Sequence, residues 1–161
     1  MSEGFVTFSV HFKYFGSWLS FSLRDDYGVG RRFWAGNAFM GALEKFWRYP
    51  HVNMYSKYMI FREIPCNLLF WGCEIWALTQ SLLDKLEVFL HHSIRRILVI
   101  IMGQVRERHI KRSHILTMFY KIPCGRNQVA FRQLTCVGKI LRCEGSHIPT
   151  IFLTDWCDNP R

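Results

Sequence analysis

The chain has 161 residues, half of them hydrophobic, and its 21 Lys and Arg against 12 Asp and Glu give a formal net charge of +9. This length predicts one domain, or one domain with a small appendage, and the apolar content argues against gross disorder. No secretory signal precedes the first predicted element, and no apolar run reaches the ~20 residues that span a bilayer, so we expect an intracellular protein without a transmembrane segment and with reduced cysteines.

The positive charge is concentrated in the second half of the chain. Residues 1–90 hold nine Lys and Arg against eight Asp and Glu, whereas residues 91–142 hold eleven against one, Glu107. A basic block on a folded domain indicates a polyanionic partner, either nucleic acid or an acidic membrane surface. A solvated basic face that has no partner is the alternative.

A small β-hairpin is predicted at the start of the chain. Phe5 to Phe12 alternates weakly between apolar and polar residues, Gly16 supplies a turn, and Trp18 to Leu23 returns as a second strand. Asp25-Asp26 then provides a polar stop and a helix start that suits the helix dipole. Paired carboxylates can also hold metal ions for phosphoryl transfer, but the other acids of this half are scattered.

Helical periodicity begins at Arg31. A first helix is expected from Arg31 to Trp47, before Pro50 ends it. Two further helices are expected at Ile60 to Leu78, with a kink at Pro65, and at Ser81 to Met102, with Ser81 as the cap. The short polar break between them favours an antiparallel pair. Their predicted buried stripes are Ile60, Ile64, Leu68, Trp71 and Ile75 in the first, and Leu83, Leu86, Leu90, Ile94, Ile97 and Ile101 in the second.

The last third is less periodic. Residues 104–112 are expected to begin as a loop, Ser113 to Tyr120 as a short helix, and Gln128 to Cys143 as the last clear helix. Four apolar residues of that last helix are predicted to face the core: Ala130, Leu134, Val137 and Leu141. The opposite side would then present Arg132, Lys139 and Arg142 to phosphate groups.

The sequence therefore predicts a mainly α fold with a small N-terminal β-hairpin. Its expected parts are a hairpin (1–24), a helical core (25–102), a basic helical extension (103–143) and an irregular segment (144–161).

No pattern in the chain specifies catalysis or a cofactor. Cys143, His147 and Cys157 could supply three zinc ligands, but a zinc site normally shows a close cysteine pair and four ligands. His91-His92 is read as part of a helix edge. Walker loops, nucleophile elbows and dinucleotide fingerprints are absent from the sequence, so we expect no cofactor in this chain.

Four segments share an order that is typical of one family. The first is Lys13-Tyr14-Phe15-Gly16-Ser17, followed by Arg31-Arg32 and the alanine-containing stretch Ala38 to Leu43. The others are Leu68 to Trp76 (LLFWGCEIW), Leu86 to Leu98, and Arg132 to Arg142. Together, over about residues 12–142, they resemble the region after the palm in the reverse transcriptases of non-LTR retrotransposons. Phe15 and Lys139 depart from the usual leucine and histidine of that pattern.

The resemblance implies a helical thumb that follows the backbone of a template–primer duplex, and a hairpin that grips the primer end. The family's Tyr-x-Asp-Asp metal box lies upstream of the hairpin, whereas Asp25-Asp26 follows it. We therefore expect a fragment of an RNA-directed DNA polymerase that lacks the catalytic palm and the Mg²⁺ of that palm, and that is inactive alone. Its partners would be nucleic acid and the missing fingers and palm. The nucleic-acid contacts implied are Lys13, Tyr14, Gly16, Ser17, Arg95, Arg96, Arg106, Arg108, Lys111, Arg132, Lys139 and Arg142.

Two other readings stay open. The chain could be a helical module that binds a membrane surface or another protein through exposed apolar residues. It could also be a remnant with no activity.

Overall fold

The computed structural model describes residues 9–14, 16–22 and 25–143, and it confirms a mainly helical fold with a small antiparallel hairpin. The elements are β1 (His11–Tyr14), β2 (Ser17–Ser20), α1 (Asp26–Ala42), α2 (Glu44–Arg48), α3 (Met54–Phe61), α4 (Asn67–Phe70), α5 (Gln80–Ile97), α6 (Met102–Glu107), α7 (Arg112–Met118) and α8 (Gly125–Leu141). A π-helical turn, Arg62–Cys66, joins α3 to α4, and a 3₁₀ turn, Cys73–Ile75, precedes α5.

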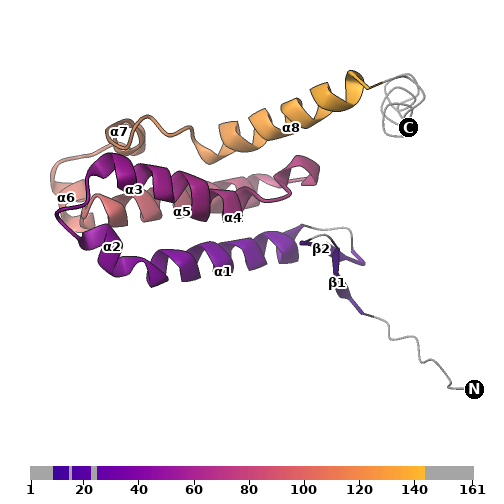
Figure 1. The fold of residues 1–161 in the computed structure, drawn as a ribbon, viewed down its shortest axis with the longest axis horizontal. Helices are drawn as coiled ribbons and strands as arrows, with labels where there is room; N and C mark the ends of the chain where they lie inside the picture. The colour runs from indigo at the N-terminus through magenta and orange to yellow at the C-terminus, as the bar shows by residue number, and fades with distance from the viewer. Residues whose placement is uncertain (1–8, 15, 23–24, 144–161) are drawn as a thin grey trace, which may run out of the picture.

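The long helices α1, α5 and α8 lie roughly along one direction, whereas α7 is seen end-on (Figure 1). Figure 1 shows α1 on one side, α3, α4 and α5 in the middle and α8 on the opposite side, with α6 and α7 gathered at one end and the hairpin at the other. The buried core follows this arrangement, because α5 contacts α1, α2, α7 and α8. Among the described residues no helix is both long and apolar enough to cross a membrane.

The predicted and observed buried residues agree best on the central helix α5. Leu86, Leu90, Ile94 and Ile97 are buried as expected, but Leu83 is half-buried, and Ile101 is 68% exposed because the helix ends at Ile97. The predicted cap was wrong, because Thr79 rather than Ser81 begins the helix, and the Thr79 hydroxyl accepts from the Leu82 amide at 3.4 Å. Thr79 is the residue with extended backbone, which is the conformation that an N-cap needs.

The helix predicted from Ile60 to Leu78 is shorter than expected. It ends at Phe70, after the π-helical turn that contains Pro65, and Gly72 with φ of +78° then redirects the chain. The predicted stripe was also displaced, since Trp71 and Ile75 are exposed while Phe61, Leu69 and Phe70 are fully buried. The π-helical turn adds a residue to the local repeat, so positions that are spaced for an α-helix no longer share one side of this segment. Pro65 explains the turn, because it cannot donate a helical hydrogen bond.

Two cysteines lie inside this core. Burial raises the pKa of Cys66 to about 12 and that of Cys73 to about 11. Both therefore remain neutral thiols at physiological pH and pack as small apolar side chains. The cysteines that the structure describes are all free, and Cys157 lies outside the described residues.

Helix α1 contacts the core through a glycine. A Cβ atom added at Gly36 would lie 2.9 Å from Cζ of Phe89, whereas one added at Gly30, on the same helix, would meet nothing within 4 Å.

We expect Gly36→Ala to lower the free energy of unfolding by about 1–3 kcal/mol through overpacking. Gly30→Ala, its matched control, should raise it by about 0.5–1 kcal/mol, because alanine restricts the unfolded chain. Urea denaturation measures both, and equal effects would contradict this packing.

Candidate nucleic-acid interface

The C-terminal end of α5, helix α6 and the start of α7 form a positively charged surface at one end of the molecule (Figure 1), which we call the basic end. It is defined by Arg95, Arg106, Arg108, Lys111 and Arg112. The last four are exposed, and none of these four forms an ion pair with another described residue. Glu107 is the one acid in this stretch of the sequence. The charge of the basic end is therefore largely uncompensated, which is how a surface that attracts polyanions is built.

Local backbone geometry explains why these side chains project. α6 is short and contains no buried residue. His109, with φ of +47°, turns the chain between α6 and α7, and only Ile115 of α7 is buried. Short helices with little buried surface leave most of their side chains in water, so Arg106, Arg108 and Lys111 surround the turn without packing into the core.

Arg95 and the buried His91 link the basic end to the core. The Arg95 Nε atom donates to the His91 carbonyl at 3.3 Å, and a second nitrogen of its guanidinium contacts the sulfur of Met102. Burial lowers the pKa of His91, and the positive charges of Arg112 and Arg95 lower it further, against the opposing effect of Glu87. His91 is therefore neutral at pH 7 and adds no charge to the surface.

Arg96, unlike the neighbouring Arg95, forms an ion pair with an acidic residue. Its guanidinium forms an ion pair with Glu44, and Glu44 also pairs with Arg48 at 2.6 Å. The triad ties α5 to α2. Arg96 therefore has a structural partner that a phosphate group would have to compete with, and we leave it out of the basic end.

The hairpin residues lie in a different place, on the far end of α1 (Figure 1). Gly16, with φ of +81°, forms the turn between β1 and β2, and the Arg32 guanidinium donates to its carbonyl. A Cβ at Gly16 would lie 3.3 Å from Nε1 of Trp71, and one at Gly72 would lie 2.8 Å from the Ser17 hydroxyl. The two glycine turns can approach because neither carries a side chain. Lys13 and Tyr14 are exposed beside this junction.

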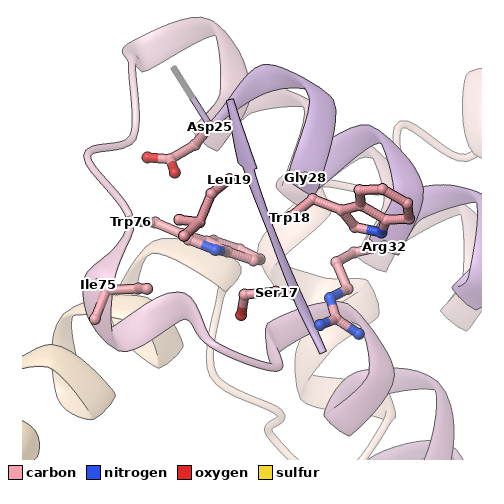
Figure 2. A pocket seen from close by; sticks show the side chains of 8 residues that line it. All are labelled: Ser17, Trp18, Leu19, Asp25, Gly28, Arg32, Ile75 and Trp76. Carbon is pink, nitrogen blue, oxygen red and sulfur yellow. The ribbon is translucent and has the colours of Figure 1, made fainter. Parts of the chain in front are cut away.

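A small cavity lies where the hairpin, α1 and the segment before α5 meet. Figure 2 shows the side chains that line it: Ser17, Trp18, Leu19, Asp25, Gly28, Arg32, Ile75 and Trp76. Its volume of about 20 Å³ is near that of one water molecule. Asp25 accepts a hydrogen bond from the Ala77 amide at 2.7 Å, which joins α1 to the 76–79 segment. The cavity is too small for a substrate, and Asp25 holds the fold together there.

The predicted orientation of α8 was wrong. Leu134 and Leu141 are 72% and 55% exposed, whereas Arg132 turns inward and donates to the Phe70 carbonyl at 3.3 Å and to Asn67 at 2.8 Å. Gln133 likewise donates to the carbonyls of Cys73 and Trp76. Polar side chains of α8 therefore attach this helix, by hydrogen bonds, to α4 and to the turn that follows α4. Lys139 and Arg142 are exposed, whereas Arg132 is held by its hydrogen bonds to α4, although it lines a hollow together with Lys139.

The N-terminus of α8 is fixed by α5. Glu87 accepts from the Arg126 amide at 3.0 Å, and the Arg126 side chain pairs with Asp84. Gly125 packs against Leu90, and a Cβ there would lie 3.3 Å from a Leu90 methyl group. A carboxylate at a helix N-terminus is favoured by the helix dipole, so this contact sets where α8 starts.

The structure thus separates residues that the sequence grouped together. The basic end and the hairpin lie at opposite ends of α1, and Lys139 with Arg142 lies on α8 (Figure 1). Arg112 belongs to the basic end although it was not among the expected contacts; its position next to Lys111 was the available signal. Among the described residues no group of three or more His, Cys, Asp or Glu could hold a metal ion, and His147 and Cys157 of the suggested zinc set lie outside them.

No protein-family model, curated protein or solved structure matches this chain. The site must therefore be judged from its own geometry and charge.

Proposed function

We propose that this chain binds the sugar–phosphate backbone of nucleic acid through its basic end. The observation that carries the proposal is the set of four exposed cations, Arg106, Arg108, Lys111 and Arg112, that lack an acidic partner among the described residues. Exposed cations around short helices suit phosphate groups, whose positions along a duplex vary little with base sequence. The charged groups of these four residues match phosphate oxygens, so backbone contact is the mode that we propose.

The wider setting of this activity rests on the resemblance to the post-palm region of non-LTR retrotransposon reverse transcriptases. On that proposal the helices act as a thumb and the hairpin as a second contact at the primer end, through Lys13, Tyr14, Gly16 and Ser17. Helix α1 separates the two contacts, and its 17 residues span about 25 Å. At 3.4 Å per base pair along one strand, this corresponds to about seven base pairs of duplex.

An exposed apolar cluster on the hairpin fits a partner for this region. Phe12, Leu19, Val10 and Phe21 are all exposed there. An isolated two-stranded hairpin is marginally stable, so these side chains would gain from further strands packed beside them. A palm domain would supply such strands, and catalysis together with its Mg²⁺ would belong to that domain.

Binding of a DNA duplex at several salt concentrations tests the proposal. Four neutralised phosphates predict a slope of log K against log salt of about −3 to −4, and binding that changes little with base sequence. Anionic lipid vesicles form the second arm, because a membrane or protein-interaction module is the competing function that the exposed hairpin residues favour. Duplex binding without salt dependence, or vesicle binding that survives high salt while duplex binding is absent, would contradict the proposal.

A further inference from the structure

A series of aromatic rings and one guanidinium lies where the hairpin meets α1. The Arg31 guanidinium carbon is 5.4 Å from the ring centre of Trp34 and 5.7 Å from that of Trp18. Trp18 contacts Tyr27 edge-on, with ring centres 5.4 Å apart, and Tyr27 stacks on His11 at 3.9 Å. These contacts attach both strands of the hairpin to α1. We call Trp18, Arg31 and Trp34 the aromatic platform.

Trp34 forms the solvent-exposed end of the platform. Its side chain is 66% exposed, and Tyr27, Arg31 and Trp34 follow at steps of four and three, so they share one side of α1. The residues four positions before and after Trp34 are Gly30 and Ala38, which are both exposed and carry little or no side chain. At these two positions nothing covers the indole, so one large aromatic surface is open to a ligand.

The charge beside the platform is positive. Arg31 is exposed and forms no ion pair with a described residue. Lys13 is also exposed and lies directly opposite Trp18 in the ladder of β1 and β2, so both side chains project from the same face of the hairpin. The exposed Asp26 lies about 140° from Arg31 around α1, because it is five residues earlier. The platform therefore offers an aromatic surface with two cations.

A flat ring linked to an anionic group fits this combination. Bases of a single strand stack on aromatic side chains, whereas paired bases are already stacked inside the duplex. A sugar ring or an apolar protein surface would also pack on an indole, but neither accounts for the cations Arg31 and Lys13. We propose that the aromatic platform binds single-stranded nucleic acid, with an unpaired base on Trp34 and the adjoining phosphates near Arg31 and Lys13.

This site is separate from the basic end, which lies at the other end of α1 (Figure 1). It adds contact with an unpaired strand to the proposed contact with duplex backbone, and it does not depend on that contact.

Two labelled probes test the proposal by fluorescence anisotropy with the full chain. One is an oligothymidylate of about eight nucleotides, a length within the range of single-strand sites, and the other is an abasic oligomer of the same length. Both carry the same phosphates, so the basic end contributes equally to each. We expect the parent chain to bind the oligothymidylate about tenfold or more tightly than the abasic oligomer, as stacking of bases on aromatic rings requires.

Substitutions locate the preference on the platform. Trp34→Leu should abolish it and leave the affinity for the abasic oligomer and for duplex unchanged, because leucine has no aromatic surface. Trp34→Phe should keep most of the preference, since the smaller ring still stacks. Phe131→Leu is the matched control, because Phe131 is 71% exposed on α8, and it should bind both probes as the parent does.

Each outcome decides the question. Equal binding of the two probes by the parent chain would overturn the proposal, and this comparison needs no variant to fold. A preference that survives in Trp34→Leu, or that Phe131→Leu removes equally, would overturn it as well. Duplex binding with the parent salt slope in Trp34→Leu would show that the basic end works independently of the platform.

Discussion

Replacing Arg106, Arg108 and Lys111 together by glutamine should flatten the salt dependence of duplex binding by about two to three units of slope, since each phosphate contact contributes about 0.9. The loss should be similar for unrelated sequences, because backbone contacts carry no base information. All three side chains are exposed and none of them pairs with a described acid, so the fold should be retained. Fluorescence anisotropy at several salt concentrations measures the slope.

A variant with the same change in net charge controls for long-range attraction. Lys45, Arg62 and Lys85 are exposed on α2, on the π-helical turn and on the first half of α5. Their replacement by glutamine should weaken steering slightly but keep the parent slope to within about one unit. If both triple variants flatten the slope equally, the basic end has no special role and net charge alone accounts for binding.

Phe70→Ala should lower the free energy of unfolding by about 3–5 kcal/mol, a large fraction of the roughly 5–15 kcal/mol that holds a domain together. Phe70 is fully buried at the end of α4. Its carbonyl accepts from Arg132, and the Arg132 guanidinium lies 5.8 Å from the centre of its ring. Truncation therefore leaves a cavity and also removes a surface on which α8 rests.

Phe21→Ala is the matched comparison for this substitution. Phe21 is 91% exposed, so the same change of residue type should alter stability by no more than about 0.5 kcal/mol. Urea denaturation followed by circular dichroism gives both values. If the two variants lose similar amounts of unfolding free energy, Phe70 does not belong to the buried core that the structure shows.

The fold class was predictable because two signals were strong. The stripe of α5 has polar residues opposite it, so its spacing identified a single buried side. Gly16 marked the hairpin turn, which the structure has between β1 and β2 with φ of +81°. Local signals of this kind depend on neighbouring residues alone and are therefore visible in the sequence.

The orientations of the other helices were not predictable in the same way. The π-helical turn changes the register of the segment that leads to Phe70, and α8 has apolar residues on the side that faces water. The position of α8 is set by long-range hydrogen bonds from Arg132 and Gln133 to turn carbonyls, between residues about sixty positions apart. A basic residue in such a role looks identical, in the sequence, to one that contacts phosphate.

The candidate site was partly predictable for a related reason. The run of basic residues in the sequence pointed to Arg106, Arg108 and Lys111, and all three are exposed. It could not separate them from Arg96, which is engaged by Glu44 of a helix about fifty residues away. Only the packing of α5 against α2 shows that Arg96 is paired with an acidic residue, whereas Arg106, Arg108 and Lys111 are not.

Lysine footprinting in the presence of a duplex tests the central claim most directly. Acetylation rates of single lysines, read by mass spectrometry with and without saturating duplex, report which surface is covered. Lys111, in the basic end, should lose reactivity by about tenfold on binding, whereas the exposed Lys85 of α5 should change by less than about twofold. If Lys111 stays as reactive as Lys85 while the duplex is fully bound, the basic end is not the nucleic-acid surface of this protein.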